Sequence, residues 1–122
     1  MKEFLGSIFE FLFNKSGGLF IVLVVAVILD FITGICLAVY QKKLSSKIGY
    51  KGISKKIAIF VLVAVSNVID TYLMDSSGFL STVCAVFYIS NECISIIENS
   101  AKMGVPIPEK LKNALDALKK KG

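Results

Sequence analysis

The sequence predicts an all-α polytopic membrane protein with three transmembrane helices, a short N-terminal interfacial helix and a basic amphipathic C-terminal helix. Three observations predict this class. The chain of 122 residues is 55% hydrophobic, with a mean hydropathy of +0.73. Its apolar residues gather in three long runs, and most of its charged residues lie outside those runs. This composition is too apolar for an ordinary soluble domain and fits one compact membrane unit.

The three runs predict spans at residues 19–40, 57–74 and 79–97, within a transmembrane domain of residues 19–98. A helix needs about 20 apolar residues to cross the hydrocarbon core of a bilayer. The first run is apolar enough to insert readily. Insertion of the third is close to neutral because its apolar residues are set against two strongly polar ones. A span this marginal needs neighbouring helices, so we expect the protein to assemble.

Residues 1–18 form an expected N-terminal amphipathic segment. Its apolar stretch, residues 2–15, is too short to cross a bilayer at about 1.5 Å per residue, which favours a helix lying in the interface. The segment lacks the basic start and small-residue cleavage pattern of a signal peptide, so we expect the chain to be retained whole.

Residues 99–122 form an expected cytoplasmic basic tail. Gly104 and Pro106 end the third helix, and an apolar stripe then predicts a basic amphipathic helix. That stripe suits an anionic membrane surface or a partner protein. Its apolar residues are Leu111, Leu115 and Leu118.

Lysine placement predicts the topology, because all 14 basic residues are Lys. The first connection, residues 41–56, carries six lysines and no acid, and Gly49 and Gly52 predict a turn there. The second connection, residues 74–78, is acidic, and the tail is basic again. The positive-inside rule then places the N-terminus outside and the C-terminus in the cytoplasm. The lysines assigned to the membrane surface or to topology are Lys42, Lys43, Lys47, Lys51, Lys55, Lys56, Lys119, Lys120 and Lys121.

Each apolar run contains an acid: Asp30, Asp70 and Glu92. A carboxylate at mid-bilayer costs on the order of 2.5–3.5 kcal/mol on insertion scales. No Lys lies within the runs, and the chain has no Arg or His, so no basic partner is expected inside the membrane. Each acid must be protonated, face a water-filled cavity, or hydrogen-bond to another helix.

Polar and small residues recur at helical spacing in all three spans. They form a first-span stripe (Ala26, Asp30, Gly34, Ala38), a second-span face (Ala58, Leu62, Ser66, Asp70) and a third-span stripe (Ser81, Ala85, Tyr88, Glu92, Ser95, Asn99). Such stripes either hold helices together or line water. The candidate pore-lining or helix-packing residues are Asp30, Thr33, Gly34, Ser66, Asn67, Asp70, Tyr88, Asn91, Glu92, Ser95, Glu98 and Asn99.

The composition argues against catalysis. With no His, no Cys–base pair and no metal-ligand cluster, we expect no catalytic residue, metal or cofactor. Cys36, Cys84 and Cys93 lie in apolar runs and are expected to act as small buried apolar residues. The basic stretches are short and contain one aromatic residue, Tyr50, so no nucleic-acid partner is expected.

The chain resembles the toxin-secretion/phage-lysis holin family, which includes pneumococcal-phage-type holins and holin-like proteins of clostridial toxin loci. The strongest match is the block from Asn91 to Asn99, NECISIIEN, followed by GVPIP at residues 104–108. Asp30 with Thr33-Gly34, the basic SSKIGYKGISKK connection and Asp70 also match. The resemblance covers residues 19–118.

The resemblance implies a holin that forms homo-oligomers in the bacterial cytoplasmic membrane, in contact with anionic lipid. Its lesion would release an endolysin or a large toxin, which would pass through without being bound. Two alternatives remain open from the residues alone. One is a small oligomeric ion channel or proton-coupled transporter that uses the intramembrane acids. The other is a structural subunit docked by its basic tail to a soluble partner.

Overall fold

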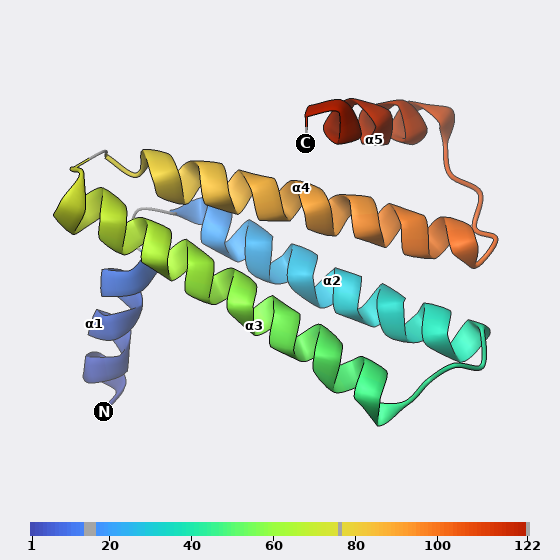
Figure 1. Ribbon diagram of the computed structural model, residues 1–122, viewed down its shortest axis with the longest axis horizontal. Coiled ribbons are helices and arrows are strands. Elements are labelled where there is room, and N and C mark those ends of the chain that lie inside the picture. The colour runs from blue at the N-terminus through green and yellow to red at the C-terminus, as the bar shows by residue number, and fades with distance from the viewer. Residues whose placement is uncertain (14–16, 76, 122) are drawn as a thin grey trace.

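Three long helices lie side by side and form the body of the protein (Figure 1). The computed structural model describes residues 1–13, 17–75 and 77–121. The long helices are α2 (Gly18–Tyr40), α3 (Ser46–Val68) and α4 (Phe79–Lys102). Helices α2 and α4 run in the same direction, and α3 runs opposite to both. The all-α prediction is confirmed for the described residues, and three of their helices are long and apolar enough to cross a membrane.

Helix α3 begins well before the expected second span. Residues 41–56 were predicted to form a turn, but the chain is helical from Ser46 onward. The Ser45 hydroxyl accepts a hydrogen bond from the Ile48 amide at 3.3 Å and caps the helix. Gly49 and Gly52 each cost about 1 kcal/mol of helix propensity, which tertiary packing outweighs. The turn prediction was therefore wrong for all but the first residues of this connection.

The end of α3 is joined to the start of α4 by a buried carboxylate. A π-helical turn, η2 (Ile69–Leu73), continues α3 and contains Asp70. The two Asp70 oxygens accept hydrogen bonds from the amides of Leu80 (2.9 Å) and Ser81 (2.7 Å). Those amides belong to the first turn of α4, where backbone donors lack helical partners. Asp70 is fully buried, so its membrane-buried charge is offset by two donors and by the positive end of α4.

Helix α1 (Lys2–Phe13) packs across one end of the three-helix body (Figure 1). The side-chain amide of Asn67, which is fully buried on α3, donates to the Phe11 carbonyl at 2.7 Å. The Phe11 ring stacks on Tyr72 with centroids 5.2 Å apart, and Phe13 packs against Phe20 at 4.4 Å. The predicted N-terminal helix is confirmed, whereas residues 14–16 lie outside the described residues.

The third long helix continues further than expected, to Lys102, so Asn99 belongs to it rather than to the tail. Gly104 follows with a φ of +87°, a left-handed conformation that suits glycine after a helix end. Helix α5 (Glu109–Lys121) then runs back over α4 (Figure 1). This confirms the predicted C-terminal helix. The side chain of Lys121 lies outside the described part of the chain.

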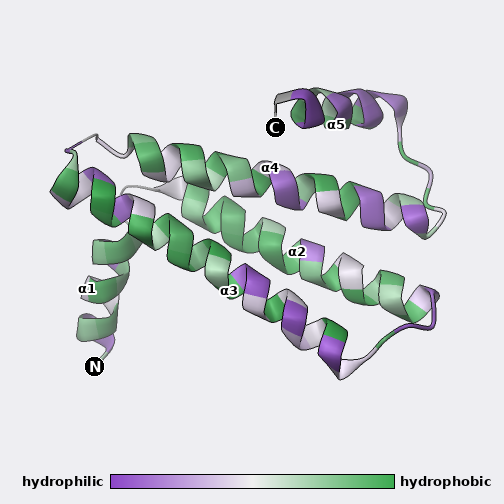
Figure 2. Ribbon diagram, in the orientation of Figure 1, coloured by the Kyte–Doolittle hydropathy of each residue, from purple (hydrophilic) through white to green (hydrophobic). Residues whose placement is uncertain are grey.

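The three-helix body has a small buried core, and most of its large apolar side chains lie on its outer surface. Leu23, Val27 and Val63 form the buried core. Large apolar side chains of all three long helices stay exposed, such as Ile21, Val61 and Phe79. Figure 2 shows α2 as mostly hydrophobic, and it shows hydrophilic residues in the first half of α3 and again near its end. An apolar exterior of this kind requires hydrocarbon around it.

Asp70→Asn should destabilise the protein. The Asn side chain has one acceptor oxygen where the carboxylate has two. One backbone N–H group in the first turn of α4 therefore loses its hydrogen-bond acceptor. We expect a loss of about 1–2 kcal/mol in the free energy of unfolding, measured in detergent micelles. Asp75→Asn, on the exposed connection, is the matched control and should leave stability unchanged. Equal stability of the two variants would contradict the capping role of Asp70.

Candidate functional site

Three charged side chains, one from each long helix, meet inside the body. The ammonium nitrogen of Lys56 on α3 lies 2.6 Å from Asp30 Oδ2 on α2 and 2.9 Å from Glu92 Oε2 on α4. Asp30 is 8% exposed and Glu92 is 5% exposed. Lys56 donates a hydrogen bond to each carboxylate. We call Asp30, Lys56 and Glu92 the ion cluster.

The ion cluster corrects the expectation that no basic partner lies inside the membrane. Lys56 was grouped with the connection lysines because it precedes the second apolar run in the sequence. Since α3 starts at Ser46, Lys56 lies within the helix and not at its edge. The antiparallel path of α3 then brings Lys56 beside the middle of α2 and α4, where both acids are located.

A polar side chain extends the ion cluster along α2. The Asn99 amide nitrogen donates to Asp30 Oδ1 at 3.3 Å and to the Thr33 hydroxyl at 3.1 Å. The Thr33 hydroxyl donates in turn to the Asp30 carbonyl at 3.0 Å. A β-carbon on Gly34 would lie 3.8 Å from the Asn99 nitrogen, so a side chain larger than methyl would meet Asn99.

The charges of the ion cluster do not cancel when all three groups are ionised. Two carboxylates then face one ammonium, and one negative charge is left over. A buried ion pair is costly to desolvate, and removing one partner is worse because it leaves a buried charge unmatched. Lys56 is therefore the member whose removal is most costly, because it is the counter-charge of both acids.

The stripes predicted on the first and third spans face each other. Ala26, Asp30 and Ala38 are buried on α2, and Ser81, Ala85 and Glu92 are buried on α4. Small residues let the two backbones approach closely. In the single subunit these stripes are packing surfaces, and the prediction that they line water belongs to an assembled state.

The face predicted for the second span is covered only in part within the single subunit, where Asp70 is buried and Ser66 is half-buried. Ala58 and Leu62 are exposed, whereas Val63 and Asn67 are buried. The Ser66 hydroxyl donates to the Leu62 carbonyl of its own helix at 2.9 Å. The inward line of α3 and η2 consists of half-buried Lys56 and buried Val63, Asn67 and Asp70, which recur at helical spacing. This pattern is visible in the sequence once the helix is extended back to Ser46.

The remaining predicted residues lie outside the ion cluster. Tyr88 packs against the apolar core. Ser95 is half-buried on α4 and its side chain borders the ion cluster at Asp30, whereas Asn91 is exposed on the same helix. Glu98 forms an exposed ion pair of 3.6 Å with Lys119 of α5. Of the cysteines, Cys84 and Cys93 are half-buried, but Cys36 is exposed, so the expectation of a buried Cys36 was wrong.

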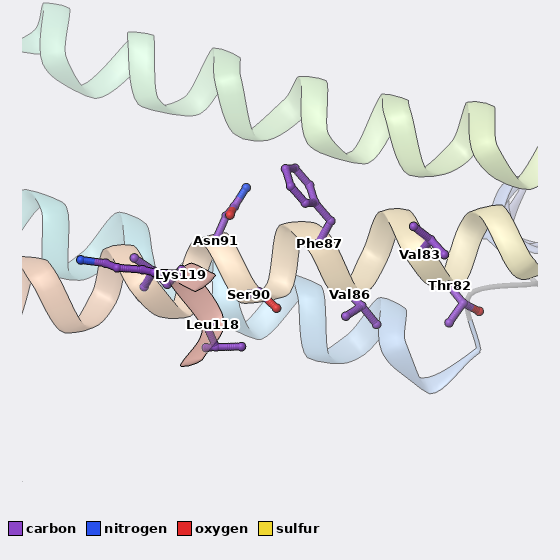
Figure 3. A pocket seen from close by; sticks show the side chains of 9 residues that line it. Thr82, Val83, Val86, Phe87, Ser90, Asn91, Leu118 and Lys119 are labelled. Carbon is purple, nitrogen blue, oxygen red and sulfur yellow. The ribbon is translucent and has the colours of Figure 1, made fainter. Parts of the chain in front are cut away.

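A groove of about 700 Å³ runs along the outer side of α4, with the last turns of α5 beside it. In Figure 3, Phe87 and Asn91 point to one side of the groove, and Val86 and Ser90 point to the other. Leu118 and Lys119 contribute from α5. The residues that line the groove do not include Asp30, Lys56 or Glu92, so the groove and the ion cluster use different side chains.

An apolar exterior, three long helices and an internal ion cluster define a polytopic membrane protein. The model of the bacteriophage holin family matches residues 7–120, and the chain belongs to this family. The predicted resemblance is thereby confirmed. The bacteriophage holin family is not a family of enzymes.

Relatives of similar length cover nearly the whole chain. A probable holin of Bacillus phage phi105 is 39% identical over 108 residues, covering 88% of this chain and 78% of the relative. An uncharacterized 14.9 kDa protein in the nagH 3' region of Clostridium perfringens is 44% identical over 117 residues, covering 96% of this chain and 89% of the relative. An uncharacterized protein of Listeria monocytogenes is 44% identical over 110 residues, covering 90% of this chain and 78% of the relative. No solved structure matches the chain.

Lys56→Met should destabilise the protein strongly, because it leaves two buried carboxylates without a counter-charge. We expect a loss of about 3–5 kcal/mol in the free energy of unfolding in detergent micelles. Lys55→Met removes a neighbouring exposed lysine and should change stability by less than about 0.5 kcal/mol.

The triple variant Asp30→Asn/Lys56→Met/Glu92→Gln provides the rescue. It removes every charge of the ion cluster and should regain most of the stability lost in Lys56→Met. If Lys56→Met were as stable as Lys55→Met, the ion cluster would not hold the helices together.

Proposed function

We propose that this protein is a holin that forms homo-oligomers in the bacterial cytoplasmic membrane and opens a lesion for an endolysin or a large toxin. Membership of the bacteriophage holin family supports this role. The observation that carries the proposal is the ion cluster, a strongly polar group buried within a body of apolar exterior. The cargo passes through the lesion and is not bound by it.

The ion cluster explains why opening should be collective. In one subunit the polar stripes of α2 and α4 cover each other, so the acids on these stripes are kept out of contact with lipid. Separating these helices in lipid would expose Asp30, Glu92 and Asn99 to hydrocarbon, which is costly. Separation becomes favourable when several subunits turn their stripes toward a shared water-filled space. Each opened subunit then lowers the cost for its neighbours.

The arrangement of the ends supports the predicted orientation. The α2–α3 connection and the end of α4 lie at one end of the body, while α1 and the α3–α4 connection lie at the other (Figure 1). Lys42, Lys43 and Lys102 therefore gather at a single end, which the positive-inside rule places in the cytoplasm. Cytoplasmic lysines of α5 can then contact anionic lipid. Helix α1 crosses the body at the opposite end, as an interfacial helix would.

A second candidate function is a small oligomeric ion channel or proton-coupled transporter. The ion cluster favours it as well, because ionisable residues within membrane helices commonly serve ion or proton pathways. The size of the permeating species separates the two functions. A channel passes ions alone, whereas a holin releases folded proteins.

Induced expression should stop growth and release a folded cytoplasmic reporter enzyme into the medium of cells whose wall has been removed. The reason is that subunits accumulate until collective opening is favourable. The measurement is reporter activity outside the cells, recorded together with membrane potential. Loss of potential without reporter release would favour the channel, and accumulation with both intact would contradict both functions.

Glu92→Leu should abolish or delay reporter release without loss of protein. It leaves the Asp30–Lys56 pair balanced, makes α4 easier to insert and removes one acid from the stripe expected to face water. Glu109→Leu removes an exposed acid outside the long helices and is the control. Cells that express it should release the reporter enzyme at the normal time. Unchanged timing in Glu92→Leu would remove Glu92 from the proposed lesion.

Single cysteines test the orientation in a variant that lacks Cys36, Cys84 and Cys93. Before any lesion opens, a membrane-impermeant maleimide should label Met74→Cys in intact protoplasts, because the second connection is expected outside. Lys47→Cys should react only after the protoplasts are lysed. Both native side chains are exposed on the subunit, so a difference in labelling reports the side of the membrane and not burial within the protein. The reverse labelling pattern would contradict the orientation.

A further inference from the structure

The outer face of α4 carries a polar side chain where lipid is expected. Asn91 lies near the middle of α4 and is exposed. Among the described residues, no hydrogen bond to its side-chain amide is found. Val83, Phe87 and Ile94 flank it at spacings of four, four and three residues and line the same groove. We call Val83, Phe87, Asn91 and Ile94 the outer row of α4.

An unpaired amide on this face is unfavourable in hydrocarbon. A primary amide without a hydrogen-bond partner costs several kcal/mol in an apolar medium. Glu92 and Asn99 of the inner stripe already bond to Lys56 of α3 and Asp30 of α2, and no bond from either to Asn91 is found among the described residues. Asn91 therefore needs a partner from outside its own three-helix body.

Helix α5 is a poor candidate for that partner. It contributes Leu118 and Lys119 to the groove, and its ion pair with α4 joins Lys119 to Glu98 rather than to Asn91. Helix α5 is also rich in lysine, and each Lys placed at mid-bilayer costs about 2.5–3.5 kcal/mol. Once α4 spans the bilayer, α5 has to leave the groove for the membrane surface. The link at residues 103–108, with Gly104 and two prolines, permits this movement.

A second copy of the chain fits the vacated row. A primary amide both donates and accepts hydrogen bonds, so two Asn91 side chains related by a twofold axis satisfy each other. Polar side chains of this kind join membrane helices. The flanking Val83, Phe87 and Ile94 supply apolar contact, and Ser90 is small enough to allow close approach.

We propose that the outer row of α4 pairs with the outer row of a second subunit through Asn91. In the single subunit α5 covers part of this surface, so its departure precedes pairing. The proposal rests on the self-association that the holin function requires, and assigns that contact to one face and one residue. The inner stripes are left free to form the lesion.

Oxidative cross-linking in isolated membranes tests this face, again in the variant without native cysteines. Phe87→Cys reports on the outer row, and Val25→Cys on α2 and Val65→Cys on α3 are the controls. The three native side chains are 49%, 49% and 47% exposed. Val25 lies about two turns after the start of α2, Phe87 about two turns after the start of α4, and Val65 about two turns before the end of η2. We expect disulfide-linked dimers mainly from Phe87→Cys. Equal cross-linking at the three positions would overturn the proposal.

Asn91→Leu in the Phe87→Cys protein tests the role of the amide. Interhelical hydrogen bonds in membranes are worth roughly 0.6–1.5 kcal/mol, so we expect the dimer fraction to fall about three- to tenfold. Asn91→Gln keeps the amide and should retain part of the dimer. The melting temperature of the detergent-solubilised subunit should not fall in Asn91→Leu, since no contact within the subunit is lost. An unchanged dimer fraction would overturn the proposal.

Reporter release measured in the same cells separates this inference from the proposed function. Release without preferential cross-linking at Phe87→Cys would overturn the α4 interface and leave the holin function standing. Preferential cross-linking without release by the wild-type chain would support the interface and contradict the holin function.

Discussion

The contact of Lys56 with Asp30 and Glu92 is the constraint on which the rest of the structure depends. It joins the three long helices at one point, with N–O distances of 2.6 and 2.9 Å. None of these charges could face hydrocarbon alone at acceptable cost. The opposite direction of α3, its early start and the close approach of α2 and α4 all serve to bring the three groups together.

The three intramembrane acids have different roles, although the sequence presents them alike. Asp70 accepts hydrogen bonds from two backbone amides at the start of α4 and so caps that helix, which is a structural role. Asp30 and Glu92 share one lysine and form the polar centre of the body. A function that requires helices to separate therefore depends on Asp30 and Glu92, while Asp70 keeps the α3–α4 corner intact during any such change.

The two sides of α4 divide the tasks of a protein that has to be stable alone and active in groups. The inner side bonds to α3 through Glu92 and to α2 through Asn99. The outer side presents Asn91 in an otherwise apolar row, partly covered by α5. Because Asn91 and Glu92 are about 100° apart around the helix, subunits could associate through the outer row while the inner contacts remain closed.

The sequence by itself determined the three apolar helices, the flanking helices and the stripes of small and polar residues on α2 and α4, because these follow from hydropathy and local helical period. That the two stripes face each other was decided by the tertiary structure. It did not determine where α3 begins, because Gly49 and Gly52 favour a turn locally and only packing outweighs their cost. Lys56 was not identified from the sequence as the partner of Asp30 and Glu92, because the predicted turn placed it before the second helix. Lys56 is 26 residues from Asp30 and 36 from Glu92 in the chain, so only the antiparallel packing of α3 decides that they meet.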